Sequence, residues 1–150
     1  MSLEYSATLS AAQKYAEQGK IEEWIHEYLL GEGHNKPFSD GLKLFVRYYS
    51  APLALPLSSL CRCCGPEENM TYRVHPEVFE RKVQGIMQAA ESGVDLPPLI
   101  VNYADGSLTL NDGNHRFEAY SRLGFADCQV IIWTSSEQDM ADFKEKYVKG

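Results

Sequence analysis

Five consecutive residues, Asp112 to Arg116, place a carboxylate, an imidazole and a guanidinium around a glycine. An arginine can hold phosphate oxygens through two parallel hydrogen bonds, and a histidine can donate or accept a proton near neutral pH. The glycine allows a ligand to approach the backbone closely. We therefore predict a phosphate or nucleotide site at Gly113, Asn114, His115 and Arg116, with His115 and Asp112 as candidate catalytic side chains.

The elements around these residues should form a strand-to-helix bend. The pair Asp105-Gly106 is typical of a type I′ hairpin turn, and Gly124 is a typical helix stop. The spacing predicts strands at 99–103 and 107–110, a helix from Gly113 to Gly124 and a strand at 128–133. The first amides of a helix carry the positive end of its dipole, so the helix start would add to the anion site.

Some of these side chains have simpler interpretations as well. Gly113 could be needed only for its backbone conformation, and His115 could be an ordinary surface histidine. Asp112 could accept hydrogen bonds at the bend, orient His115 or Arg116, or contact a metal ion. Glu118 could form an ion pair with Arg122 four residues later, which is the interpretation that we favour for it.

The stretches PPLIV (97–101) and DGNHRFEAYSRLG (112–124) resemble the ParB/sulfiredoxin superfamily. This superfamily contains ParB N-terminal domains, sulfiredoxins and ADP-dependent free-serine kinases, and its hallmark is a Gly-x-[His/Arg]-Arg turn that opens a helix. The resemblance extends over residues 53–133. It implies an α+β fold, in which a small mixed sheet packs against helices, and here this domain would follow a helical N-terminal extension.

The resemblance also implies roles for two more cations. The segment from Pro56 to Arg62 is similar to the first strand of sulfiredoxins, including its arginine, and Lys82 lies where those proteins carry a nucleotide-contacting lysine. Arg62, Lys82 and Arg116 would then neutralise phosphates. The expected ligand is ATP or another nucleotide with magnesium, or a phosphorylated small molecule. An enzyme of this kind would transfer a phosphoryl group or hydrolyse a nucleotide.

The chain departs from the superfamily at several points. Asn114 stands where sulfiredoxins place their reactive cysteine, so we do not expect sulfinic acid reduction. Gly85 falls where sulfiredoxins offer a nucleotide-contacting hydroxyl. About 17 residues follow Trp133, which is too few for the helix-turn-helix and dimerisation segments of ParB proteins.

Two other functions are consistent with the same residues. The domain could be a non-catalytic ligand sensor or protein adaptor, with the N-terminal helices as the partner surface. It could also be a ParB-like nuclease, which would need a metal-binding cluster of acids, for which the candidates are Glu67, Glu68 and Asp112.

The length of 150 residues predicts one compact unit, with a helical extension over 1–50 and the ParB/sulfiredoxin-like domain over 51–150. Two glycine-bounded helices are expected at 8–18 and 21–30, and Ser39 or Asp40 could cap a third with Leu42, Phe45, Val46 and Tyr49 on one face. The remaining predicted elements are a strand at 53–60, a helix from Pro76 to Gly93 and a last helix capped by Ser135 or Ser136. The buried face of the helix from Pro76 is expected to contain Val78, Phe79, Val83, Ile86, Met87 and Ala90.

Charge and cysteine content set the expected surroundings. The net charge is −7, from 14 lysines and arginines against 21 acids, so we do not expect duplex DNA as a partner. The chain shows no membrane-length apolar run and no secretory signal. The cluster Cys61, Cys63 and Cys64 suggests the reducing cytoplasm; it could bind zinc, although buried small hydrophobes are the simpler interpretation.

Overall fold

The computed structural model describes residues 3–62, 64–65 and 72–148, with only the backbone at 64, 65, 72 and 73. The helices are α1 (Leu9–Glu17), α2 (Ile21–Leu30), α3 (Lys36–Leu42), α4 (Pro76–Glu91), α5 (Asn114–Arg122) and α6 (Glu137–Tyr147). The strands are β1 (Tyr48–Tyr49), β2 (Leu53–Pro56), β3 (Cys61–Arg62), β4 (Cys64–Gly65), β5 (Tyr72–Arg73), β6 (Leu99–Ala104), β7 (Ser107–Asp112) and β8 (Asp127–Thr134). Among these residues, no helix is long and apolar enough to cross a membrane.

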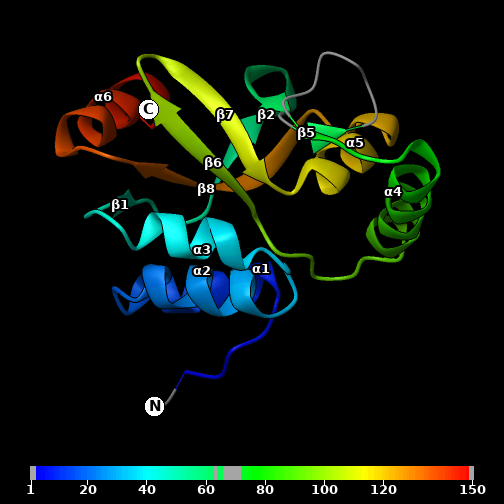
Figure 1. Ribbon diagram of the computed structural model, residues 1–150, viewed down its shortest axis with the longest axis horizontal. Helices are drawn as coiled ribbons and strands as arrows, with labels where there is room; N and C mark the ends of the chain where they lie inside the picture. Colours follow the sequence, from blue (N-terminus) through cyan, green and yellow to red (C-terminus); the bar gives the residue numbers. More distant parts are fainter. Residues whose placement is uncertain (1–2, 63, 66–71, 149–150) are drawn as a thin grey trace.

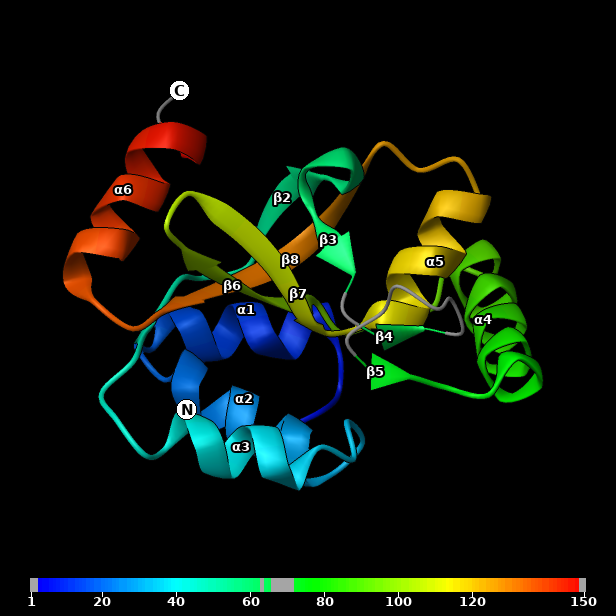
Figure 2. The ribbon, with the colours of Figure 1, turned by 45° about the horizontal axis from the view of Figure 1, so that its top comes forward.

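A mixed six-stranded sheet forms the centre of the molecule (Figure 1). Its order is β1-β8-β6-β7-β3, and β2 pairs with β8 next to β1. β6 is parallel to β8 and antiparallel to β7, whereas β3 is parallel to β7. Strands β4 and β5 form a separate parallel pair, which lies beside α5 in Figure 2. The mixed sheet and its helices confirm the predicted α+β fold class.

Helices cover both faces of the sheet because alternate side chains of its central strands point in opposite directions. Ile100 and Ile131 pack against the buried residues of α1 and α2. Leu99, Val101 and Ile132 belong to a second core, which includes Met140 and Phe143 of α6 and Tyr120 of α5. In Figure 1, α1–α3 accordingly lie on one side of the sheet, with α4 and α5 at one end.

The β6–β7 hairpin and the helix after it follow the sequence prediction closely. Asp105 and Gly106 both have positive φ, at 51° and 78°, as a type I′ turn requires. The strand β7 ends at Asp112, Gly113 is the N-cap of α5, and Gly124 follows the helix with φ of 80°. Local turn chemistry therefore fixes the direction in which α5 leaves the sheet.

The helices α1 and α2 also form where predicted, at the glycine-bounded segments. The Thr8 side chain caps α1 by accepting a hydrogen bond from Ala11 N at 3.1 Å. The apolar stripe of α2 is buried through Trp24, Ile25, Tyr28 and Leu29. This stripe packs on the sheet rather than facing solvent.

A third helix forms, but the predictions of its cap and of its end are wrong. Asn35 caps α3, not Ser39 or Asp40, because Asn35 Oδ1 accepts from Phe38 N at 3.4 Å and Pro37 suits the first turn. The helix ends at Leu42, so Phe45 and Val46 are 71% and 73% exposed. Tyr48 and Tyr49 instead pair with β8 as strand β1, since pairing to a sheet edge outweighs the helical periodicity.

Two further predictions need correction. The strand expected at 53–60 ends at Pro56 as β2. A 3-10 turn at Leu57–Ser59 follows, so the chain leaves β8 and comes to lie beside β7 as β3. Helix α4 starts at Pro76 and buries Phe79 and Val83, as predicted, but Val78 is 41% exposed. The last helix, α6, is capped by Ser136 as predicted.

Candidate functional site

A cleft of about 820 Å³ lies where the start of α5 faces the N-terminal helices. One wall is the turn between β7 and α5 together with Lys82 of α4, and the other is the segment that joins α2 to α3. The lining residues are Tyr28, Glu32, Gly33, His34, Asn35, Pro37, Phe38, Lys82, Asn111, Asp112, Gly113, Asn114, His115 and Arg116. The cleft therefore contains the predicted turn, and its second wall comes from a part of the chain about 80 residues earlier.

Gly113 is required at the turn for two reasons. Its φ of 105° is a conformation that residues with a side chain rarely adopt. A Cβ here would also lie 2.8 Å from Leu99 Cγ and 2.9 Å from Arg116 Nη2. As the N-cap, Gly113 brings no side chain over the start of α5. The positive end of this nine-residue helix therefore faces the cleft.

Arg116 lies at the boundary between the two walls and is tied to both. Its Nη1 donates to the hydroxyl of Tyr28 in α2 at 2.9 Å, and its Nη2 lies 3.3 Å from both Pro98 O and Asp112 Oδ2. The Arg116 and Asp112 side chains are each 11% exposed. Asp112 thus orients Arg116, which is one of the roles considered for it, and Arg116 joins α2 to the turn.

Tyr28 is the residue of α2 that receives Arg116. Its ring lies 5.7 Å from the guanidinium carbon and stacks on Trp24 at 5.1 Å. Gly33 packs so closely on this ring that a Cβ would lie 2.8 Å from Tyr28 Cε2. Burial raises the pKa of Tyr28 to about 12, so its hydroxyl stays protonated and available as a hydrogen-bonding group. Tyr28 therefore contacts both Gly33 of the α2–α3 segment and Arg116 of α5, and so fixes the two walls relative to each other.

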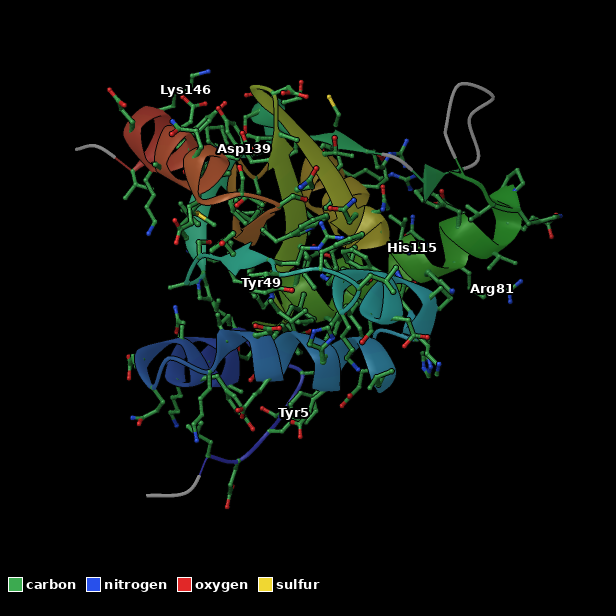
Figure 3. The ribbon with its side chains drawn as sticks, turned by 60° about the vertical axis from the view of Figure 1, so that its left-hand side comes forward. Tyr5, Tyr49, Arg81, His115, Asp139 and Lys146 are labelled. Carbon is green, nitrogen blue, oxygen red and sulfur yellow. The ribbon has the colours of Figure 1, made fainter. Side chains whose placement is uncertain are left out.

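His115 points into the cleft region from the first turn of α5 (Figure 3). Its ring lies 4.9 Å from the ring of Phe79 in α4. Burial lowers the pKa of His115, and the nearby cations Lys82 and Arg116 lower it further, against the opposing effect of Asp112. The imidazole is therefore neutral at pH 7 and can donate one hydrogen bond and accept another.

Lys82 brings a flexible cation to the same cleft. It is exposed on α4 and lines the cleft opposite the α2–α3 segment. Its neighbour Arg81 is also exposed but does not line the cleft, and Figure 3 shows it on the outer side of α4. The two side chains thus provide a matched pair of cations, one inside the site and one outside it.

Arg62 does not line the cleft, although the sequence predicted it as a phosphate ligand. Its guanidinium carbon lies 5.1 Å from the Phe79 ring centroid, and its Nη1 is 3.8 Å from Glu118 Oε1. Glu118 also pairs with Arg122 at 2.8 Å, as predicted, and Arg122 reaches Glu80 at 2.7 Å. From this position Arg62 contributes to the potential around His115 rather than to the wall of the cleft.

Among the described residues, two carboxylates line the cleft, those of Asp112 and Glu32. Asp112 is bonded to Arg116, and Glu32 accepts a hydrogen bond from Tyr5. In the part of the chain that the structure describes, no three His, Cys, Asp or Glu side chains gather as metal ligands. Glu67, Glu68 and Cys63 lie outside the described residues, as does the side chain of Cys64.

The two cysteines whose side chains are described differ in their surroundings. Cys61 is exposed on β3, and Cys128 is buried in β8. Burial raises the pKa of Cys128 to about 11, so it is a protonated thiol at neutral pH.

Asn114, which stands at the position of the sulfiredoxin cysteine, is 5% exposed at the start of α5.

The second wall, from Glu32 to Phe38, and the role of Tyr28 were not predicted from the sequence. In the sequence, Tyr28 belongs to the apolar stripe of α2, and Gly31 and Gly33 indicate only the end of that helix. The stretch Gly-Glu-Gly-His-Asn (31–35) combines glycines with polar side chains, which is typical of a binding loop. This composition is the signal that could have identified the wall.

No protein family model matches the chain. One curated protein, the BEACH domain-containing protein lvsE of Dictyostelium discoideum, is 34% identical over 70 residues. The match covers 43% of this chain and 3% of that protein, so the chain spans only a small fraction of its relative's length.

Two solved structures are similar to part of this chain. Sulfiredoxin from Arabidopsis thaliana is 22% identical, with a TM-score of 0.47 over 62% of this chain and 96% of that one. A C-terminally truncated ParB from Caulobacter crescentus, complexed with CTP-gamma-S, is 18% identical, with a TM-score of 0.44 over 67% of this chain and 55% of that one. Both proteins are of the kinds that the motif resembles, and each is similar to part of this chain.

Proposed function

We propose that the protein binds a nucleotide, or another phosphorylated small molecule, in the cleft between α5 and the α2–α3 segment. One observation carries the proposal: the start of α5, Lys82 and His115 line the same cleft, which has a volume of about 820 Å³. A helix N-terminus, a lysine and a neutral imidazole are together suited to phosphate oxygens. The volume is within the range of small-molecule sites.

Each residue of the turn has its own part in this proposal. Backbone amides at Gly113 and Asn114 would approach the phosphate, Lys82 would supply a mobile positive charge, and His115 would donate a hydrogen bond. Arg116 and Asp112 are bonded to each other and to α2, so we assign them to positioning the site. Arg62 would act at longer range. Caulobacter ParB was solved with CTP-gamma-S, a ligand of the same class. The support for the proposal comes from the geometry of this cleft.

If the protein is an enzyme, phosphoryl transfer or nucleotide hydrolysis is the reaction class to test. The described acids of the cleft are Asp112 and Glu32, and Asp112 is paired with Arg116, so they do not fit a dedicated magnesium site. Magnesium would therefore enter with the phosphates of the nucleotide. His115, neutral at pH 7, would donate a hydrogen bond from its ring N–H to the transferred phosphoryl group or the leaving oxygen.

A thermal shift panel with ATP, ADP, CTP and GTP, each with and without magnesium, tests the proposal. A ligand at one hundred times its Kd stabilises the fold by about 2.7 kcal/mol, which raises the Tm of a chain of this size by roughly 5 to 11 °C. We expect Lys82→Ala to weaken binding about tenfold, because it removes a charge-assisted contact to phosphate. Arg81→Ala, with the same charge change outside the cleft, should bind like the wild type.

Equal losses in the two variants would show that only general charge matters and would contradict the site. No shift with any nucleotide in the wild type would contradict nucleotide binding. The protein adaptor would then be the better hypothesis, with Leu44, Phe45 and Val46 as its candidate surface, since these side chains are 74%, 71% and 73% exposed.

A further inference from the structure

The two walls of the cleft differ in chemistry. The wall at α5 and α4 presents Lys82, His115 and helix amides, which favour anions. The opposite wall presents the Glu32 carboxylate, the His34 ring and the Phe38 ring, and no lysine or arginine from this segment lines it. A carboxylate repels phosphate. A ligand that fills the cleft should thus have its phosphates at one wall and hydrogen-bond donors at the other.

Glu32 is held at this wall by a distant residue. The hydroxyl of Tyr5 donates to Glu32 Oε1 at 2.8 Å, across 27 positions of the sequence. Tyr5 packs in turn beside Trp24, with 6.4 Å between the ring centroids. An ionised carboxylate has about four acceptor sites, so one bond from Tyr5 fixes the group and leaves acceptor capacity for a ligand.

The backbone of this wall is also fixed relative to the anion site. Gly33 packs on the Tyr28 ring, and the Tyr28 hydroxyl is bonded to Arg116. His34 adopts a positive φ of 47°, which directs the chain from α2 into the Asn35 cap of α3. The distance between Glu32 and the start of α5 is therefore set by the fold. A fixed distance lets a site select ligands of a matching length.

We infer that the α2–α3 segment recognises the nucleoside part of the bound nucleotide, with Glu32 accepting hydrogen bonds from an exocyclic amino group or a ribose hydroxyl. Glu32 is then a specificity-determining residue that the N-terminal helices add to the phosphate site of α5. This inference rests on the proposed function, since it requires phosphates at the opposite wall.

Calorimetric titration of Glu32→Gln with two probes tests the inference. The probes are inorganic pyrophosphate and whichever of ATP, ADP, CTP or GTP binds the wild type most tightly. Glutamine keeps the size of the side chain and an acceptor for Tyr5, so the fold should survive. We expect nucleotide affinity to fall about tenfold, because a charged acceptor is lost, while pyrophosphate affinity stays equal or rises slightly as a repelling charge disappears. Glu23→Gln, an exposed acid of α2 outside the cleft, is the matched control.

The outcomes separate this inference from the proposed function. Unchanged nucleotide affinity in Glu32→Gln, or wild-type affinity for pyrophosphate equal to that for the nucleotide, would overturn the role of the wall. If Lys82→Ala still weakened both probes, the phosphate site would stand. A wild type that binds neither probe would overturn the proposed function and the inference with it.

Discussion

Gly113 is subject to two separate constraints, a positive φ and a close approach by Leu99 and Arg116. Gly124 has a positive φ of 80° as well, but no atom lies within 4 Å of the position that a Cβ would take. We expect Gly113→Ala to lower the free energy of unfolding by about 3 kcal/mol, from backbone strain plus overpacking. Gly124→Ala should cost about 1 kcal/mol, from strain alone. Urea unfolding of the two variants checks this, and equal costs would contradict the close approach.

At the scale of single residues, the sequence predicted residues that line one cleft but did not predict all their contacts. Gly113, His115 and Lys82 were predicted and line one cleft. Arg116 was predicted to neutralise phosphate directly, whereas its guanidinium is bonded to Tyr28, 88 positions away. Short-range patterns identify a turn or a helix start. They carry no information on which distant hydroxyl an arginine meets after folding.

At the scale of elements, the bond between Tyr28 and Arg116 joins α2 to α5. We expect Tyr28→Phe to lower the free energy of unfolding by about 1 to 3 kcal/mol, because it leaves a buried guanidinium nitrogen without its acceptor. Tyr49→Phe is the control, since its buried hydroxyl has no hydrogen-bond partner among the described residues. Guanidinium chloride unfolding measures both variants. A loss in Tyr28→Phe no larger than that in Tyr49→Phe would show that the bond does not contribute to docking.

The elements that the sequence predicted correctly are those with local signals. The hairpin, α5 and α6 follow from turn and capping residues that lie within their own segments. The predicted cap of the third helix was wrong because Asn35, Ser39 and Asp40 are all suitable capping residues in one short stretch. Its predicted end was wrong because Tyr48 and Tyr49 pair with β8, which the local pattern does not reveal. Helical periodicity alone does not decide such cases, where tertiary pairing determines the outcome.

At the scale of the whole molecule, the segment predicted as a helical extension and the segment predicted as the main domain share a core and a cleft. Ile100 and Ile131 of the sheet pack with the N-terminal helices, and the cleft has one wall from each segment. We accordingly expect the ligand to contact both segments at once, so that the N-terminal helices form part of the site.

Backbone NMR of the isotopically labelled protein, titrated with the tightest-binding nucleotide, tests this central claim most directly. We predict the largest chemical-shift changes in two stretches far apart in sequence, 112–116 and 32–38, together with Lys82. Shifts confined to 112–116 would contradict a two-walled site. Shifts centred elsewhere, for example around Phe125 and Cys128, would contradict the assignment of the site to this cleft.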